Sequence, residues 1–243
     1  MTHPASDPVQ PAYLAKLPGL LSQLRGGLIV SCQAEADEPL HGSDHMAAMA
    51  VAAAEGGAVG IRANTPMDIA AIRSVITLPI IGIYKLDMPG YVVRITPTLD
   101  SAVQVAQAGA DIIAIDGTSR PHPDNLNLSE RIHLIHDQTS CPVMADISNC
   151  DEGITAQQAG ADIVATTLSG YTEASPTQDS PDFELLQRLV STLNVPIVAE
   201  GRIATPEQAC QALVMGAYAV VVGSAITRPQ WITAKFVQRM VNP

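Results

Sequence analysis

The chain repeats one pattern of alternating strand-like and helix-like segments, and this repeat constrains its fold more than any other feature. Three apolar runs open with a proline at their second position: Leu-Pro-Ile-Ile (78–81), Cys-Pro-Val-Met (141–144) and Val-Pro-Ile-Val (195–198). Between them, Ala-Gly-Ala-Asp precedes further apolar runs, at residues 108–111 and 159–162. Gly-Gly-Ala (56–58) and Met-Gly-Ala-Tyr (215–218) occupy corresponding places. The spacing indicates a βαβα unit that occurs four times, with a period of roughly 50–60 residues.

Eight short apolar runs are predicted as strands, each separated from the next by a helical segment. They lie at residues 28–31, 58–61, 79–84, 112–115, 142–145, 163–165, 195–199 and 218–222. Alternating β and α segments without hairpin signals favour a parallel sheet. An open, doubly wound sheet shows the same alternation, but eight units with fourfold repetition suit a closed barrel better. We therefore expect a (β/α)8 TIM barrel with an N-terminal capping helix at residues 13–25.

Length and composition are consistent with one barrel domain. The chain has 243 residues, of which 47% are hydrophobic, and barrels of this class need about 250 residues. No linker-like stretch interrupts the middle, so we expect a single domain at residues 12–243 after a flexible tail at residues 1–11. The four cysteines form no CxxC pair, and neither a signal peptide nor an apolar run of about 18 residues is present. These features favour a cytoplasmic protein.

Charge and histidine spacing narrow the range of partners. The formal net charge is −11, from 13 Lys and Arg against 24 Asp and Glu. Such a balance argues against nucleic acid or an anionic membrane as a partner. His41 and His45 have helical i, i+4 spacing, but no third ligand accompanies them, so we expect no metal site. Neither GxxxxGK[ST] nor GxGxxG occurs, so a nucleotide cofactor is not expected.

Polar side chains follow the predicted strands, and the carboxyl ends of barrel strands meet at one mouth. In chain order these residues are Gln33, Arg62, Lys85, Asp116, Asp146, Thr166, Thr167, Glu200 and Arg202, with Arg228 shortly after the last strand. Because the chain has only 13 Lys and Arg, four of them at one rim predict an anion site in an acidic protein. Gly201, Gly223 and Ser224 offer backbone amides where barrels frequently bind phosphate. The alternative is that these glycines only turn the chain.

Lys85 and Glu200 are the candidate proton carriers. A lysine at the inward end of a strand can act as base or nucleophile, and a glutamate across the mouth can be its acid–base counterpart. Two such groups on opposite faces of a carbon acid suit epimerisation. A structural ion pair is the alternative role for Lys85 and Glu200. Asp116 and Asp146 either hold sugar hydroxyls, orient Lys85, or cap the helices that follow them.

Several motifs together resemble one family. The segments SCQAEADEPLH (31–41), TTLSGYT (166–172) and GSAITRP (223–229) resemble the N-acetylmannosamine-6-phosphate 2-epimerases of bacterial sialic-acid catabolism, and the resemblance extends over residues 25–240. It implies a cofactor-independent enzyme that interconverts N-acetylmannosamine 6-phosphate and N-acetylglucosamine 6-phosphate. In that family the lysine matching Lys85 is the base at C2, and the glutamate matching Glu200 lies opposite.

The resemblance also implies how the amino-sugar phosphate is held. Gln33, Arg62 and Asp146 would contact the sugar and its N-acetyl group. Arg228 and the glycine-rich turns would lie with the substrate or its phosphate. Thr166 and Arg202 are added to the predicted substrate contacts from their positions just past the strands, not from the resemblance. One-base and two-base mechanisms both stay open.

Two other functions and the oligomeric state remain to be distinguished. Lys85 could instead form a Schiff base in an aldolase or synthase, and a barrel that only binds sugar phosphate could serve as a sensor. We expect a homo-oligomer, a dimer. The closing helix with Trp231 and Phe236 either forms the contact between copies or packs these aromatic residues in the core.

Overall fold

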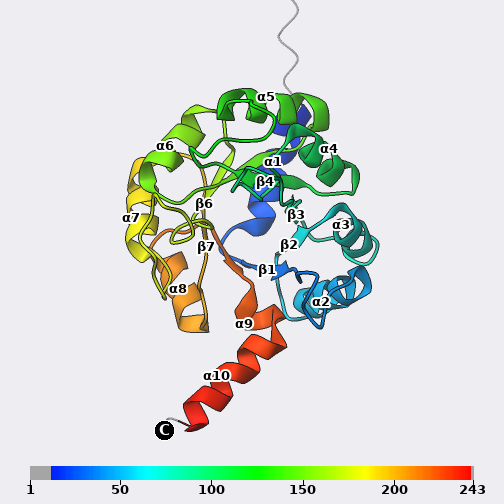
Figure 1. The fold of residues 1–243 in the computed structure, drawn as a ribbon, viewed down its shortest axis with the longest axis vertical. Helices are drawn as coiled ribbons and strands as arrows, with labels where there is room; N and C mark the ends of the chain where they lie inside the picture. Colours follow the sequence, from blue (N-terminus) through cyan, green and yellow to red (C-terminus); the bar gives the residue numbers. More distant parts are fainter. Residues whose placement is uncertain (1–11, 242–243) are drawn as a thin grey trace, which may run out of the picture.

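The computed structural model describes residues 12–241, which form a closed barrel of eight parallel strands (Figure 1). Each strand pairs with the next in sequence, and β8 pairs with β1 to close the ring. The strands are β1 (Leu28–Cys32), β2 (Gly60–Asn64), β3 (Ile80–Ile83), β4 (Ile112–Asp116), β5 (Val143–Asp146), β6 (Ile163–Ala165), β7 (Ile197–Glu200) and β8 (Ala219–Val222). The predicted (β/α)8 TIM barrel is confirmed. The predicted tail at residues 1–11 lies outside the described residues.

Helices alternate with the strands and surround the barrel (Figure 1). They are α1 (Ala12–Leu24), α2 (Ser43–Glu55), α3 (Pro66–Arg73), α4 (Leu99–Gln107), α5 (Leu128–Thr139), α6 (Cys150–Gln158), α7 (Phe183–Thr192), α8 (Pro206–Val214), α9 (Ser224–Thr227) and α10 (Pro229–Val241). Caps in the sequence fix where several of them begin. The Thr65 side chain accepts from the Asp68 amide at the start of α3, and Asn127 and Glu130 form a capping box at the start of α5. Within residues 12–241, no helix is long and apolar enough to cross a membrane.

The predicted capping helix is α1, which packs against the amino-terminal end of the barrel. Leu24 is buried together with Ile29 and Ile81 of the barrel interior. The hydroxyl of Tyr218, which directly precedes β8, donates to the Leu21 carbonyl at 2.7 Å. Because α1 covers one end of the barrel, a ligand can enter the interior only from the other end, where the strands finish.

Alternation along each strand separates two apolar layers. Side chains such as Ile61, Ala63 and Val220 pack between strands and helices, whereas Ile81, Ile83 and their neighbours fill the barrel. Successive strand residues point to opposite faces. The residues that continue the inward rows past the apolar core therefore face the open end of the barrel.

The structure corrects two details of the sequence-based prediction. Arg62 was expected just past the second strand, but β2 continues to Asn64, so Arg62 lies inside the strand and faces the interior. A short helix, α9, follows β8 where a turn was expected, and it leads directly into α10. In Figure 1, α10 extends away from the barrel instead of lying along it.

Candidate active site

A cavity of about 350 Å³ opens at the carboxyl ends of the strands. Most of the predicted site residues line it: Gln33, Arg62, Lys85, Glu200, Gly201, Arg202, Gly223, Ser224 and Arg228. The cavity is large enough for a small phosphorylated metabolite. The strands therefore bring together residues that lie up to 195 positions apart in sequence, between Gln33 and Arg228.

Arg62 is the centre of a buried charge network at the base of this cavity. Its guanidinium donates to both carboxylate oxygens of Asp146, at 2.5 and 3.1 Å, and to Glu200 Oε2 at 2.7 Å. The Arg62 side chain is 1% exposed and that of Asp146 is 0% exposed. A fully buried arginine needs such partners, because an uncompensated charge in the interior is costly.

The surroundings of Glu200 raise the pKa of its carboxyl group. Burial raises the pKa of Glu200 to about 7 from its ordinary 4.5. Arg62 opposes this rise, but the buried Asp146 carboxylate shares the same guanidinium and raises the pKa of Glu200 further. A carboxyl group with such a pKa can donate or accept a proton near pH 7.

The structure places Thr167, and not Thr166, at the cavity. Ile163 and Ala165 belong to the barrel interior and Val164 to the outer layer, so the inward row of β6 continues to Thr167. The Thr167 hydroxyl donates to Asp146 at 2.6 Å and lies 3.2 Å from Glu200. The Thr166 hydroxyl instead bonds the backbone of Glu200 and is buried. The period-two pattern of β6 was the sequence signal that distinguishes the two threonines.

Lys85 lies across the barrel from Glu200 and has a partner that sequence reasoning missed. The inward row Ile81, Ile83 of β3 continues to Lys85, whose Nζ donates to Glu35 Oε1 at 3.0 Å. Glu35 belongs to the loop between β1 and α2. Burial by itself would raise the pKa of Glu35, but Lys85 and Arg94 bring it below its ordinary value. Nothing in the sequence pairs two residues that lie 50 positions apart.

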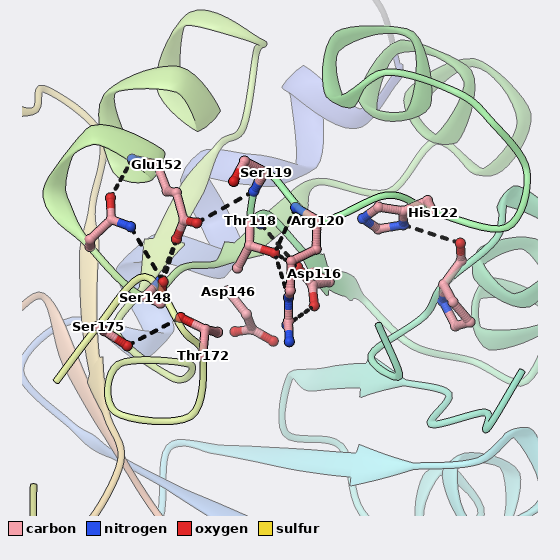
Figure 2. A network of polar contacts seen from close by, with 12 residues as sticks. Asp116, Thr118, Ser119, Arg120, His122, Asp146, Ser148, Glu152, Thr172 and Ser175 are labelled. Carbon is pink, nitrogen blue, oxygen red and sulfur yellow. Dashed lines mark hydrogen bonds and ion pairs between the residues drawn. The ribbon is translucent and has the colours of Figure 1, made fainter. Parts of the chain in front are cut away.

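Asp116 and Asp146 both end strands, but neither lines the cavity. Asp116 is 0% exposed, and its carboxylate accepts from the Thr118 amide and hydroxyl and pairs with Arg120. Figure 2 shows this cluster beside Asp146. A second cluster in the same view joins Glu152 of α6 to Ser148 and Ser119. These contacts fix the loops after β4 and β5, and neither aspartate bonds Lys85 or caps the helix that follows it.

Arg202, Arg228 and the glycine-rich turns lie on the side of the cavity formed by β7 and β8. Gly201 and Gly223 line the cavity, and Ser224 begins α9, whose first amides have no acceptor inside the helix. Arg202 donates to the carbonyls of Ser169 and Ser180, which ties the loop between β6 and α7 to this side. Arg228 pairs with Glu38.

The charges around the cavity are balanced, contrary to the expected excess of cations. Among the described residues, four cationic side chains line the cavity: Arg62, Lys85, Arg202 and Arg228. Three carboxylates line it with them (Glu35, Glu38 and Glu200), and Asp146 lies directly behind Arg62. The four cations predicted at the rim do line the cavity, but the prediction missed Glu35 and Glu38 of the β1–α2 loop. Within residues 12–241, no cluster of three His, Cys, Asp or Glu side chains is placed to hold a metal ion.

Comparisons with known proteins are consistent across sequence and structure. A model of the family described as "Putative N-acetylmannosamine-6-phosphate epimerase" matches residues 46–242. A relative from Caldanaerobacter subterraneus subsp. tengcongensis is 52% identical over 90% of this chain and 92% of its own length. A relative from Thermosynechococcus vestitus is 51% identical over 86% of this chain and 90% of its own length. Both are named "Putative N-acetylmannosamine-6-phosphate 2-epimerase".

A solved structure from Clostridium perfringens is similar over nearly the whole chain. It is described as that of an N-acetylmannosamine-6-phosphate 2-epimerase, and it superposes with a TM-score of 0.88. The two chains are 44% identical, and the match covers 98% of this chain and 99% of the other. The similarity therefore includes every strand that contributes to the cavity.

Proposed function

The chain belongs to the N-acetylmannosamine-6-phosphate epimerase family of carbohydrate epimerases, and on that basis we propose that it interconverts N-acetylmannosamine 6-phosphate and N-acetylglucosamine 6-phosphate. The two sugars differ only in configuration at C2, so the reaction requires removal and return of one proton. The observation that carries the proposal is that Lys85 and Glu200 line one cavity. Lys85 lies just past β3 and Glu200 ends β7, and these two strands lie opposite each other in the ring.

The proton on C2 becomes acidic when the sugar ring is open and C1 is an aldehyde. Lys85, as the neutral amine, takes this proton, and the C2–H electron pair forms a C1–C2 double bond while the C1 oxygen becomes an enolate oxygen. Arg62 supplies positive charge for that oxygen at the base of the cavity. When a proton returns to the opposite face of C2, the aldehyde re-forms and the epimer is complete.

We assign the returning proton, or the opening of the ring, to Glu200. Its pKa of about 7 leaves both protonation states populated at neutral pH. A one-base path, in which Lys85 and a substrate hydroxyl move the proton, is the alternative. In either path Asp146 acts through Arg62, because its carboxylate is fully buried against that guanidinium.

The remaining assignments concern substrate binding. Gln33, which donates to the Ser31 hydroxyl at 2.8 Å, and Thr167, in place of Thr166, are assigned to the sugar. The phosphate is assigned to the amides of Gly201, Gly223 and Ser224, with Arg202 and Arg228 beside them. These groups share one side of the cavity, so a phosphate bound there leaves the reacting end of the sugar toward Lys85 and Glu200.

A dimer remains our proposal for the oligomeric state, and α10 is the element that supports it. None of its residues is buried, and it exposes Phe236, Val237, Met240 and Val241. Such a row of large apolar side chains on a helix that leaves its own barrel is suited to a second copy of the chain. Phe236→Asp should yield monomers in sedimentation experiments. A wild-type protein that sediments as a monomer would contradict the proposal.

Cellular context is proposed on more general grounds. All four cysteines are unpaired, and three of them are buried, which agrees with a reducing compartment. We therefore propose a cytoplasmic enzyme of amino-sugar catabolism. Its partners would be the two amino-sugar phosphates.

The reaction is tested by proton exchange at C2. N-acetylmannosamine 6-phosphate incubated with the enzyme in deuterated water should give the epimer and incorporate deuterium at C2, followed by proton NMR. The Lys85→Met variant should keep the circular dichroism spectrum of the folded protein. It should form no epimer and incorporate no deuterium at C2. Absence of exchange and of epimer in the wild type would overturn the proposal. Trapping of the substrate on Lys85 by borohydride would point to Schiff-base chemistry instead.

A further inference from the structure

The loop between β1 and α2 contains a tight acidic turn at residues 35–38. The Glu38 amide donates to the Glu35 carbonyl at 3.0 Å, and the Glu35 amide donates to Glu38 Oε2 at 2.9 Å. The Glu38 carboxylate is therefore part of the turn itself. Any movement of that carboxylate removes one of the two bonds that close the turn.

This acidic turn contacts a cation on each side of the cavity. Glu35 Oε1 accepts from Lys85 Nζ at 3.0 Å. Glu38 Oε1 pairs with Arg228 and accepts from Gln230 Nε2 at 2.9 Å. Four consecutive residues thus connect the candidate base to the arginine beside the candidate phosphate site.

A phosphate dianion that pairs with Arg62, Lys85 or Arg228 must displace a carboxylate from that cation. The Arg62 pair with Asp146 is fully buried, and breaking it would leave a buried charge without a partner. The Arg228 side chain is 42% exposed and that of Glu38 is 10% exposed, so this pair is only partly buried and costs less to break than the fully buried Arg62 pair. Arg228 Nε is also buried without a hydrogen-bond partner, and a guanidinium binds phosphate with two parallel bonds. Arg228 is therefore the cation that a phosphate takes most readily.

We propose that Glu35 and Glu38 are positioning residues through which phosphate binding acts on Lys85. A phosphate that takes Arg228 from Glu38 loosens the acidic turn and frees Lys85 from Glu35. While Lys85 Nζ donates to Glu35, it is directed at that carboxylate and not at the substrate, whereas proton abstraction needs the amine free to face C2. The phosphate of the substrate would then both anchor the sugar and release the base. This inference rests on the proposed function for the identity of the substrate.

The test divides the substrate into two pieces, N-acetylmannosamine without its phosphate and inorganic phosphite. In the wild type, phosphite should speed deuterium exchange at C2 of N-acetylmannosamine by about tenfold or more. In Glu35→Gln, exchange without phosphite should rise and the activation ratio should fall toward one, because Lys85 is no longer held. Asp37→Asn removes the same charge from an exposed position in the same turn and should behave as the wild type.

A second readout does not depend on turnover. Lys85 acetylation by acetic anhydride, followed by peptide mass spectrometry, should be faster with phosphite in the wild type, and phosphite should have less effect in Glu35→Gln. Calorimetry should show tighter phosphite binding to Glu38→Gln, because Arg228 has lost its counter-charge. If phosphite changes neither exchange nor acetylation while the intact substrate is epimerised, the phosphate only anchors and the inference is wrong. If the intact substrate is not epimerised but phosphite still changes acetylation, the proposed function fails and the linkage stands.

Discussion

Replacing Glu200 with glutamine should change how the stability of the protein depends on pH. Burial at the inward end of β7, with help from Asp146, raises the pKa of Glu200 to about 7 from 4.5, although Arg62 and Thr167 oppose the rise. Between these two values the folded protein retains a proton that the unfolded chain has lost. The wild type must therefore lose stability as the pH rises between the two pKa values. Below the lower value and above the higher one, the contribution of Glu200 to the free energy of unfolding does not change with pH.

The magnitude follows from the size of the shift. A rise from 4.5 to about 7 at about 1.4 kcal/mol for each unit corresponds to about 3 kcal/mol. Glutamine cannot ionise, so the Glu200→Gln variant does not lose this part of its unfolding free energy as the pH rises. The free energy of unfolding of the wild type, minus that of Glu200→Gln, should therefore fall by about 3 kcal/mol from about pH 4 to about pH 8. Differences in packing between Glu and Gln add an offset that does not change with pH.

Urea unfolding followed by far-ultraviolet circular dichroism measures both free energies. Circular dichroism is the suitable probe because it follows the helices and strands of the whole barrel, whereas the single tryptophan, Trp231 of α10, reports only on the edge of the cavity. Glu173→Gln, at an exposed glutamate on the loop after β6, is the control for loss of one charge. A difference that stays constant with pH, or grows as pH rises, would refute the assignment of a raised pKa to Glu200.

Three further predictions test the surroundings of the site. Thr167→Val removes a hydroxyl that lowers the pKa of Glu200, so the midpoint of that titration in the pH profile of C2 exchange should move to higher pH. Gly82→Ala places a Cβ 2.5 Å from a side chain of α4; it should cost about 1–3 kcal/mol in urea unfolding, and a neutral result would show that the β3–α4 interface is looser than described. Because the chain carries a net charge of −11, raising KCl from about 10 to about 150 mM should increase kcat/KM for the phosphorylated substrate by severalfold. Deuterium exchange of N-acetylmannosamine should not respond to KCl, and a fall in kcat/KM with salt would show that the cavity cations dominate at long range.

Much of the fold could be predicted because its signal is repeated. Four copies of the same strand–helix pattern reinforce one another, and each strand occupies the same place relative to its neighbours. The end of β2 was misplaced because Arg62 interrupts the apolar run after Ile61, and a charged residue normally ends a buried strand. Here the charge is tolerated inside the barrel because Asp146 and Glu200 meet it there.

The candidate site could be predicted only where strands place it. Lys85 and Glu200 continue inward strand rows, so their positions follow from the barrel. The choice of Thr166 over Thr167 neglected that alternation. Glu35 and Glu38 lie on a loop, where no period relates a residue to the cavity, and their contacts with Lys85 and Arg228 are decided by the loop conformation alone.

The missed glutamates change the account of how an acidic protein takes up an anion. A rim of four unpaired cations would attract phosphate over a distance, and binding would depend on that attraction. In the structure three of these cations already contact carboxylates, and Arg202 bonds backbone carbonyls. An anion that pairs with one of these three cations must therefore replace a carboxylate, and the cost of replacement is smaller at the partly exposed Arg228 than at the buried Arg62. This order of costs supports the proposed phosphate position beside β7 and β8, in which Arg62 stays paired with Asp146 at the end proposed for proton transfer.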